Sequence, residues 1–127
     1  MKILLDTHIF LWFITGDGRL DASLRDKIRD PANDVALSVV SHWEIIVKHQ
    51  LGKLPLPAEP AAYIPAQRIA HRIASLPVDE ESVRVLATLP PLHRDPFDRM
   101  LICQAIAGSR ALATVDTAIR AYDVDVL

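Results

Sequence analysis

Short apolar runs alternate along the chain with stretches in which apolar residues recur at helical spacing. We expect the runs to form strands and the periodic stretches to form helices. The predicted strands cover 2–5, 35–40, 76–78, 111–114 and 124–127, the last as an edge strand. The predicted helices cover 8–15, 22–29, 41–52, 60–75, 80–89, 95–108 and 116–121. This alternation predicts an α/β fold of three layers, α/β/α and Rossmann-like, with a mainly parallel sheet of four to five strands.

Two of the predicted helices follow recognisable capping patterns. Asp95 followed by Pro96 is typical of a helix start, with Asp95 as the N-cap. Ser41 followed three residues later by Glu44 fits a capping box, in which each side chain bonds the other residue's backbone amide. We therefore expect one helix to start at Ser41 and another at Asp95.

The predicted helix 60–75 carries an apolar stripe along one face. Its members are Ala62, Ala66, Ile69, Ala70 and Ile73. We expect this stripe to pack in the core, although a surface for a second protein is an alternative. Pro65 either starts this helix or kinks it, because a proline inside a helix removes a hydrogen bond.

The composition favours one soluble domain, 1–127, located in the cytoplasm. Of the 127 residues, 50% are hydrophobic, which excludes a disordered chain. The formal net charge of −2 excludes a strongly basic nucleic-acid coat. Asp6 and His8 interrupt the first apolar run, so neither a signal peptide nor a membrane span of about 20 residues is expected. The single Cys103 excludes an internal disulfide and suits a reducing compartment.

Four acidic residues are expected at one edge of the sheet. Asp6 ends the first strand, Glu44 follows the second, and Asp116 follows the strand 111–114. Asp98 lies in the first turn of the helix before that strand. Strand ends and helix starts share one edge of a parallel sheet, and ligands bind there. Taken singly, Glu44, Asp98 and Asp116 could be ordinary helix-start residues.

Together, four carboxylates at one site indicate a cation. They would repel one another, and some would have to bind protons unless a cation intervened. Oxygen ligands without a Cys/His cluster suit Mg²⁺, with Mn²⁺ as a substitute, rather than zinc. A site of this kind is typical of phosphodiester hydrolysis by water.

The chain resembles PIN-domain proteins, in particular the VapC-type toxins of bacterial toxin–antitoxin pairs. The resemblance rests on four stretches: 4–8 (LLDTH), 38–45 (SVVSHWEI), 93–102 (HRDPFDRMLI) and 112–116 (LATVD). It implies a PIN-like fold and an Mg²⁺-dependent endoribonuclease. It also implies an RNA substrate, a protein antitoxin that blocks the site, and a homodimer.

The resemblance also assigns roles to residues. It implies that four acids are the catalytic and metal-binding residues: Asp6, Glu44, Asp98 and Asp116. Thr7 and Thr114 are expected to orient carboxylates. Arg99 could meet a substrate phosphate or pair with an acid, and a solvated surface arginine is the alternative.

Other residues near these stretches have ordinary explanations. We expect the N-cap role to account for Asp95. We expect the histidines near the site to be packing, polar or RNA contacts rather than ligands: His8, His42 and His93. Trp12 and Trp43 are expected in the core, with base stacking as the alternative. Six basic residues could form an RNA-facing rim or solvated helix surfaces: Lys48, Lys53, Arg68, Arg72, Arg94 and Arg110.

Two competing functions remain at this point. The first is a non-catalytic PIN-like module that binds RNA or metal, against which the four intact acids argue. The second is a receiver-like signalling domain, whose sheet also carries acids at its strand ends. That chemistry needs paired acids on the first strand and a late lysine, whereas Asp6 stands alone and no lysine follows Asp98.

Overall fold

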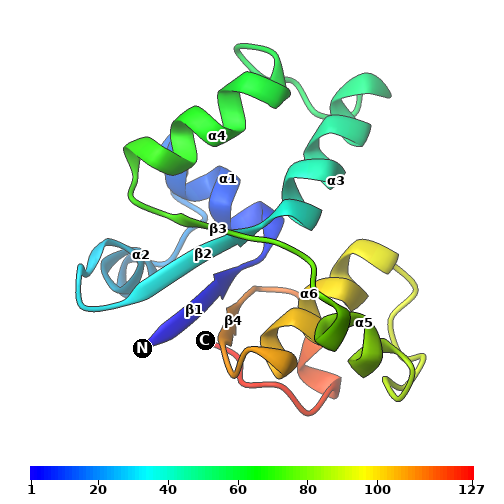
Figure 1. Ribbon diagram of the computed structural model, residues 1–127. Coiled ribbons are helices and arrows are strands. Elements are labelled where there is room, and N and C mark those ends of the chain that lie inside the picture. The colour runs from blue at the N-terminus through cyan, green and yellow to red at the C-terminus, as the bar shows by residue number, and fades with distance from the viewer.

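One four-stranded, all-parallel sheet lies at the centre of the computed structural model, which describes residues 1–127 (Figure 1). The strands are β1 (Lys2–Leu5), β2 (Asp34–Ser38), β3 (Ala74–Leu76) and β4 (Ala111–Ala113). Their order is β3-β2-β1-β4, so β1 pairs with both β2 and β4. The prediction of a parallel α/β fold is confirmed.

Helices cover both faces of the sheet (Figure 1). They are α1 (Thr7–Thr15), α2 (Ala22–Arg29), α3 (Val39–Gln50), α4 (Pro60–Ala70), α5 (Glu80–Leu86) and α6 (Pro96–Ala107), with a 3₁₀ turn, η1 (Ile119–Ala121). Residues of α1 to α4 share one core cluster, and residues of α6 and η1 share the other. The fold therefore has the three predicted layers. None of the helices is long and apolar enough to cross a lipid bilayer.

The first strand supplies apolar side chains to both layers. Ile3 and Leu5 pack in the cluster of α1 to α4, whereas Leu4 packs against Leu101 and Ile102 of α6. All five side chains are fully buried. A strand covered on both faces needs apolar residues at every position, which explains the unbroken run before Asp6.

The junction of β2 and α3 differs from the prediction. We expected the strand to continue to Val40 and the helix to start at Ser41, and both expectations are wrong. The strand ends at Ser38, whose hydroxyl oxygen accepts the Val40 amide at 3.0 Å and lies 2.5 Å from the Gln104 side-chain oxygen. Because Ser38 is the N-cap, the helix begins earlier, and both Ser41 and Glu44 are buried within it.

The segment after α4 also departs from the prediction. The helix ends at Ala70 rather than residue 75, because Arg72 takes a positive φ of 57°. The strand β3 then forms at Ala74–Leu76 and stops before Pro77, which has no amide to extend the ladder. Pro65 lies inside the helix.

The predicted core stripe of α4 faces solvent. Ala62, Ala66 and Ala70 are exposed, and Ile69 is 65% exposed. Only Ile73, beyond the helix, is buried as expected. The helix instead packs through Pro60 and Ile64, so core packing of the stripe is wrong for its four helical members.

Other elements are also shorter than predicted, among them the helix expected at 116–121, which is only the 3₁₀ turn η1. Helix α5 ends at Leu86 rather than residue 89, and the predicted strand 124–127 makes a single bridge, between Val126 and Leu112. The sheet consequently has four strands, within the predicted range of four to five.

Candidate metal centre

The sheet topology carries all four predicted acids to one region. Asp6 follows β1, Glu44 lies in α3 directly after β2, and Asp116 follows β4. Asp98 lies in the first turn of α6. The negative charges of Asp6 and Glu44 both act on Asp98, and His93 bridges Asp98 to Asp116. The four acids therefore converge.

Asp6 is only 5% exposed to solvent, and its carboxylate accepts hydrogen bonds from two donors. One carboxylate oxygen accepts the Thr7 amide at 2.7 Å, and the other accepts the Thr114 hydroxyl at 2.7 Å. Burial raises the pKa of Asp6, and the two donors oppose that shift. Thr114 thus orients this carboxylate, in agreement with its expected position.

Glu44 is also buried, and both of its oxygens are engaged. Its residue is 2% exposed. Oε1 accepts the Thr7 hydroxyl at 2.7 Å, and Oε2 forms an ion pair with Lys48, four residues later on α3. Partial burial opposes protonation of Lys48, but the contact with Glu44 prevails and raises its pKa. Lys48 therefore acts as an internal counter-ion, which differs from both alternatives considered from the sequence, an RNA-facing rim and a solvated helix surface.

Among the four acids, Asp98 has the pKa that is shifted furthest. Asp95 caps its helix as predicted, accepting the amides of Phe97 at 2.8 Å and Asp98 at 3.3 Å. Burial, followed by the charges of Asp6, Asp95 and Glu44, raises the pKa of Asp98 to about 7. Asp98 therefore keeps its proton up to about neutral pH unless a cation replaces it.

His93 lies between two of the acids. Its Nε2 is 2.9 Å from Asp116 Oδ2 and 3.3 Å from Asp98 Oδ2. Its Nδ1 accepts the Asp95 amide at 3.1 Å, so Nε2 carries the proton that is donated to Asp116. This hydrogen bond raises the pKa of His93 and lowers that of Asp116. The His93 N–H thus lies between the carboxylates of Asp98 and Asp116, a position in which a positive charge is favourable.

Arg99 bonds groups other than the four acids. Its guanidinium donates to the Pro90 carbonyl at 2.9 Å and to the Tyr122 hydroxyl at 3.3 Å. The same Tyr122 hydroxyl accepts the His93 amide at 2.7 Å. Arg99 and Tyr122 therefore position the loop that carries His93, and neither role was expected from the sequence.

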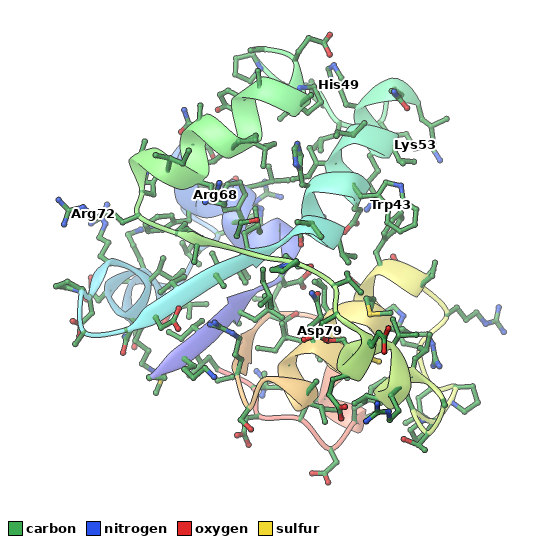
Figure 2. The ribbon with its side chains drawn as sticks, in the orientation of Figure 1. Trp43, His49, Lys53, Arg68, Arg72 and Asp79 are labelled. Atoms are coloured by element: carbon green, nitrogen blue, oxygen red, sulfur yellow. The ribbon has the colours of Figure 1, made fainter.

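Several predicted rim residues serve the fold instead. Arg68 donates to the Ile73 carbonyl at 2.9 Å, and Arg110 pairs with Asp34. Lys53 and Arg72 extend from the molecular surface (Figure 2). The sequence pattern alone could not separate these two pairs of residues, because the contacts of Arg68 and Arg110 form only once the chain has folded.

The two tryptophans have different environments. Trp12 is partly buried against the core, as expected, and Arg19 stacks 4.9 Å from the centre of its ring. Trp43 is 60% exposed, so the expectation of a core position is wrong for this residue. His42 contacts the Pro60 carbonyl at 3.1 Å, and His8 is exposed; both are compatible with the polar or packing roles expected.

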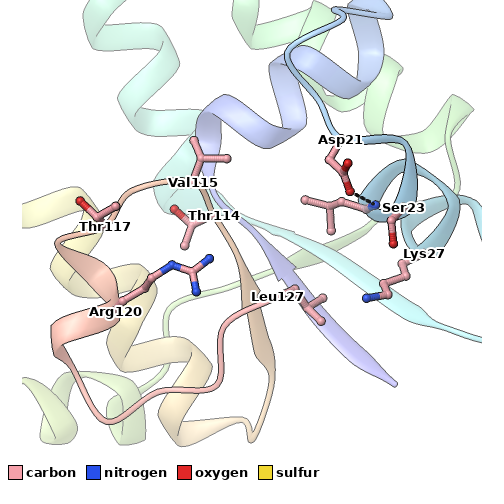
Figure 3. A pocket seen from close by; sticks show the side chains of 9 residues that line it. Asp21, Ser23, Lys27, Thr114, Val115, Thr117, Arg120 and Leu127 are labelled. Carbon is pink, nitrogen blue, oxygen red and sulfur yellow. Dashed lines mark hydrogen bonds between the residues drawn. The ribbon is translucent and has the colours of Figure 1, made fainter.

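A cavity of about 350 Å³ opens beside Thr114, between α2 and the segment after β4 (Figure 3). Lys27 and Arg120 lie on opposite sides of it, and Asp21 caps α2 at its edge. None of the four acids lines this cavity. The candidate metal centre is therefore the acid cluster itself.

The residues present fit a hard divalent cation. The donors are carboxylate oxygens, which Mg²⁺ and Mn²⁺ prefer. Oxygens of Asp98 and Asp116 lie with His93 Nε2 in a group whose members are all within 4.8 Å of one another; Asp6 and Glu44 are not part of this group. Burial and then the charges of Asp6, Asp95 and Glu44 raise the pKa of Asp98, and a bound cation would oppose that shift.

Comparisons with known proteins agree with this fold. Over residues 3–125 the chain matches the family model described as PIN domain. Among solved structures, it is similar to VapBC2 from Rickettsia felis bound to a promoter DNA fragment, with a TM-score of 0.74, 16% identity, and coverage of 100% of this chain and 97% of that one. It is also similar to VapBC-1 from nontypeable Haemophilus influenzae, with a TM-score of 0.67, 18% identity and the same coverage.

A curated relative adds a local sequence match. Ribonuclease VapC16 of Mycobacterium tuberculosis (strain ATCC 25618 / H37Rv) is 38% identical over 55 residues, which cover 43% of this chain. The match spans only 39% of the length of that relative. The match over nearly the full chain is the one to the domain model, and it establishes that the chain belongs to the PIN-domain family.

Proposed function

We propose that the protein is a metal-dependent endoribonuclease that uses Mg²⁺, with Mn²⁺ as a substitute. The observation that carries the proposal is that Asp6, Glu44, Asp98 and Asp116 meet in one region of the fold, where burial and then the neighbouring carboxylates raise the pKa of Asp98 to about 7. Membership of the PIN-domain family and the local similarity to a protein named as a ribonuclease support the same activity.

Each acid has a distinct part in this proposal. Asp6 and Asp98 are the principal metal ligands, with Glu44 and Asp116 completing the acidic site. Bound Mg²⁺ would activate water and stabilise the charge that develops on the RNA phosphate. Thr114 fixes the orientation of Asp6 through its hydroxyl. The four carboxylates come from four separate segments of the fold, so their spacing is set by the rigid sheet.

In this proposal Thr7 and His93 position the acids by donating hydrogen bonds to them. The Thr7 amide bonds Asp6 and its hydroxyl bonds Glu44, so one residue sets the separation of two carboxylates. His93 donates from Nε2 to Asp116 and keeps that acid ionised.

The biological role we propose is that of the toxin in a type II toxin–antitoxin pair. The solved structures to which the chain is similar are named as VapBC complexes, which supports a protein antitoxin as partner. The antitoxin would block the acidic site, and the toxin would act as a cytoplasmic homodimer on RNA. Growth arrest on expression, relieved by the product of a neighbouring small gene, tests this role; normal growth would contradict it.

RNA cleavage by the purified protein tests the activity. We expect cleavage with Mg²⁺, none with EDTA, and a loss of about 100-fold or more in Asp6→Asn and Asp98→Asn, since each removes a ligand charge. Glu80→Gln, which alters an exposed acid on α5, is the matched control and should cleave normally. Cleavage that survives EDTA and both site substitutions would overturn the metal-dependent mechanism, whereas no cleavage of RNA by the wild type with Mg²⁺ would favour a non-catalytic module.

A further inference from the structure

A large aromatic side chain lies exposed beside the acidic site. Trp43 precedes Glu44 on α3, and its residue is 60% exposed. Figure 2 shows its side chain extending from the first turns of α3 toward the beginning of α6. Tryptophan is usually mostly buried, so an exposed indole at a candidate active site needs a reason.

The indole is held by a second aromatic residue. Phe97, which precedes Asp98 on α6, lies with its ring centre 4.8 Å from that of Trp43, at an interplanar angle of 82°. Phe97 itself packs against the core cluster of α6. Both rings therefore stand on helical turns that also carry acids, which fixes the indole relative to Glu44 and Asp98.

This edge-to-face contact leaves a flat surface free. A T-shaped pair covers at most one face of the indole, and the exposure of Trp43 leaves most of the ring in solvent. A planar apolar group could therefore stack on Trp43 without any side chain moving.

We propose that Trp43 stacks a nucleobase of the RNA strand, next to the phosphate that the acidic site receives. This inference rests on the proposed function. Every base presents a flat aromatic face, so stacking binds an unpaired nucleotide with little sequence preference. The acids repel a phosphate until a cation is bound, and stacking supplies attraction that does not depend on charge. Trp43 would thus position the strand by a base and leave the phosphate to the acids.

Either a nucleobase or a second copy of this chain could cover the Trp43 ring. The position of the ring beside the acids favours the nucleobase. The Trp43–Phe97 contact joins the starts of α3 and α6, the two helices that carry Glu44 and Asp98, so a group stacked there lies beside the acidic site. A nucleobase has the flat apolar face and the attached phosphate that this arrangement accommodates. Burial of Trp43 in a dimer is the competing outcome of the test.

The test uses Trp43 as its own reporter. In a Trp12→Phe, Asp98→Asn protein, Trp43 is the sole tryptophan and cleavage is disabled. The probe is a stem-loop oligoribonucleotide, with a single-stranded loop, that the wild type cleaves. We expect the RNA to quench Trp43 fluorescence, and an RNA with abasic loop positions, which keeps every phosphate, to quench much less.

Substitutions give a second readout. Trp43→Ala should weaken RNA binding about 10-fold and raise KM, whereas Trp43→Phe should retain most of the affinity. Leu51→Ala, which removes an apolar side chain of similar exposure at the end of α3, is the matched control and should bind normally.

Three results would overturn the inference. They are equal quenching by the abasic RNA, an unchanged KM in Trp43→Ala, or a Trp43→Ala protein that loses dimerisation with unchanged RNA affinity per protomer. If the wild type cleaves and Trp43→Ala cleaves with the same KM, only the stacking is refuted. If the wild type fails to cleave any RNA with Mg²⁺, the proposed function itself fails.

Discussion

Thr7 joins the two most buried carboxylates of the molecule. Its amide donates to Asp6 and its hydroxyl donates to Glu44, each at 2.7 Å. Buried carboxylates are unfavourable unless donors or cations compensate them. Asp6 has two donors, and Glu44 has a donor and the cation of Lys48. Asp98 has no such compensation beyond His93, which is why its pKa departs furthest.

The charge of Asp98 should destabilise the metal-free protein as pH rises. Its pKa is 3.8 in ordinary surroundings and about 7 in the folded chain. Between these values the folded state keeps a proton that the unfolded state has lost, so stability falls from about pH 4 to pH 7 and then levels off. The raised pKa of His93 contributes stability that is present below pH 6.5 and is lost as pH rises further, in the same direction.

Asp98→Asn should remove most of this penalty. In EDTA at pH 8 we expect the variant to be more stable than the wild type by about 1 to 2 kcal/mol, with a smaller gain at pH 5. Urea denaturation at the two pH values measures the difference. A variant that is less stable at pH 8, or one whose gain is larger at pH 5, would contradict this electrostatic account.

Lys48 should stabilise the fold through Glu44. Lys48→Ala leaves a buried carboxylate oxygen without its cation, and we expect a loss of about 1 to 3 kcal/mol in the free energy of unfolding. Lys53→Ala, which removes an exposed lysine just beyond the same helix, should change stability by less than about 0.5 kcal/mol. Equal effects of the two substitutions in chemical denaturation would show that the ion pair is not stabilising.

At the scale of elements, capping patterns predicted some boundaries and missed others. The start of α6 was predicted correctly, because Asp95 and Pro96 are adjacent and act within one turn. The start of α3 was misplaced, since Val39 and Val40 favour a strand by composition while Ser38 caps a helix through them. The capping box assigned to Ser41 was a coincidence of spacing.

Ser38→Ala should therefore destabilise the protein more than Ser41→Ala. Ser38 caps α3 and also contacts Gln104, so its loss should cost about 1 to 2 kcal/mol. The Ser41 hydroxyl only accepts a bond from the Thr7 hydroxyl, at 2.9 Å. When the Ser41 side chain is removed, the Thr7 hydroxyl still has its bond to Glu44. Chemical denaturation of both variants measures the contrast, and the reverse order would restore Ser41 as the cap.

At the scale of the whole molecule, the acids could be predicted, Thr7 and Thr114 were assigned only through the family resemblance, and the place of His93 could not be predicted. Asp6, Glu44, Asp98 and Asp116 follow from strand ends, helix starts and the motif order. The contact of His93 with Asp116 spans 23 residues, and the contact of Thr114 with Asp6 spans 108. No local pattern encodes such contacts, because they depend on how β4 and the loop before α6 meet β1.

The chemistry of the RNA ends tests the central claim most directly. If the acids hold a cation that activates water, cleavage leaves a 5′-phosphate and a 3′-hydroxyl. We expect mass spectrometry of the products from wild-type protein and Mg²⁺ to find these ends, and Asp98→Asn or EDTA to abolish them. Products ending in a 2′,3′-cyclic phosphate would indicate attack by the RNA's own 2′-hydroxyl and would contradict the account.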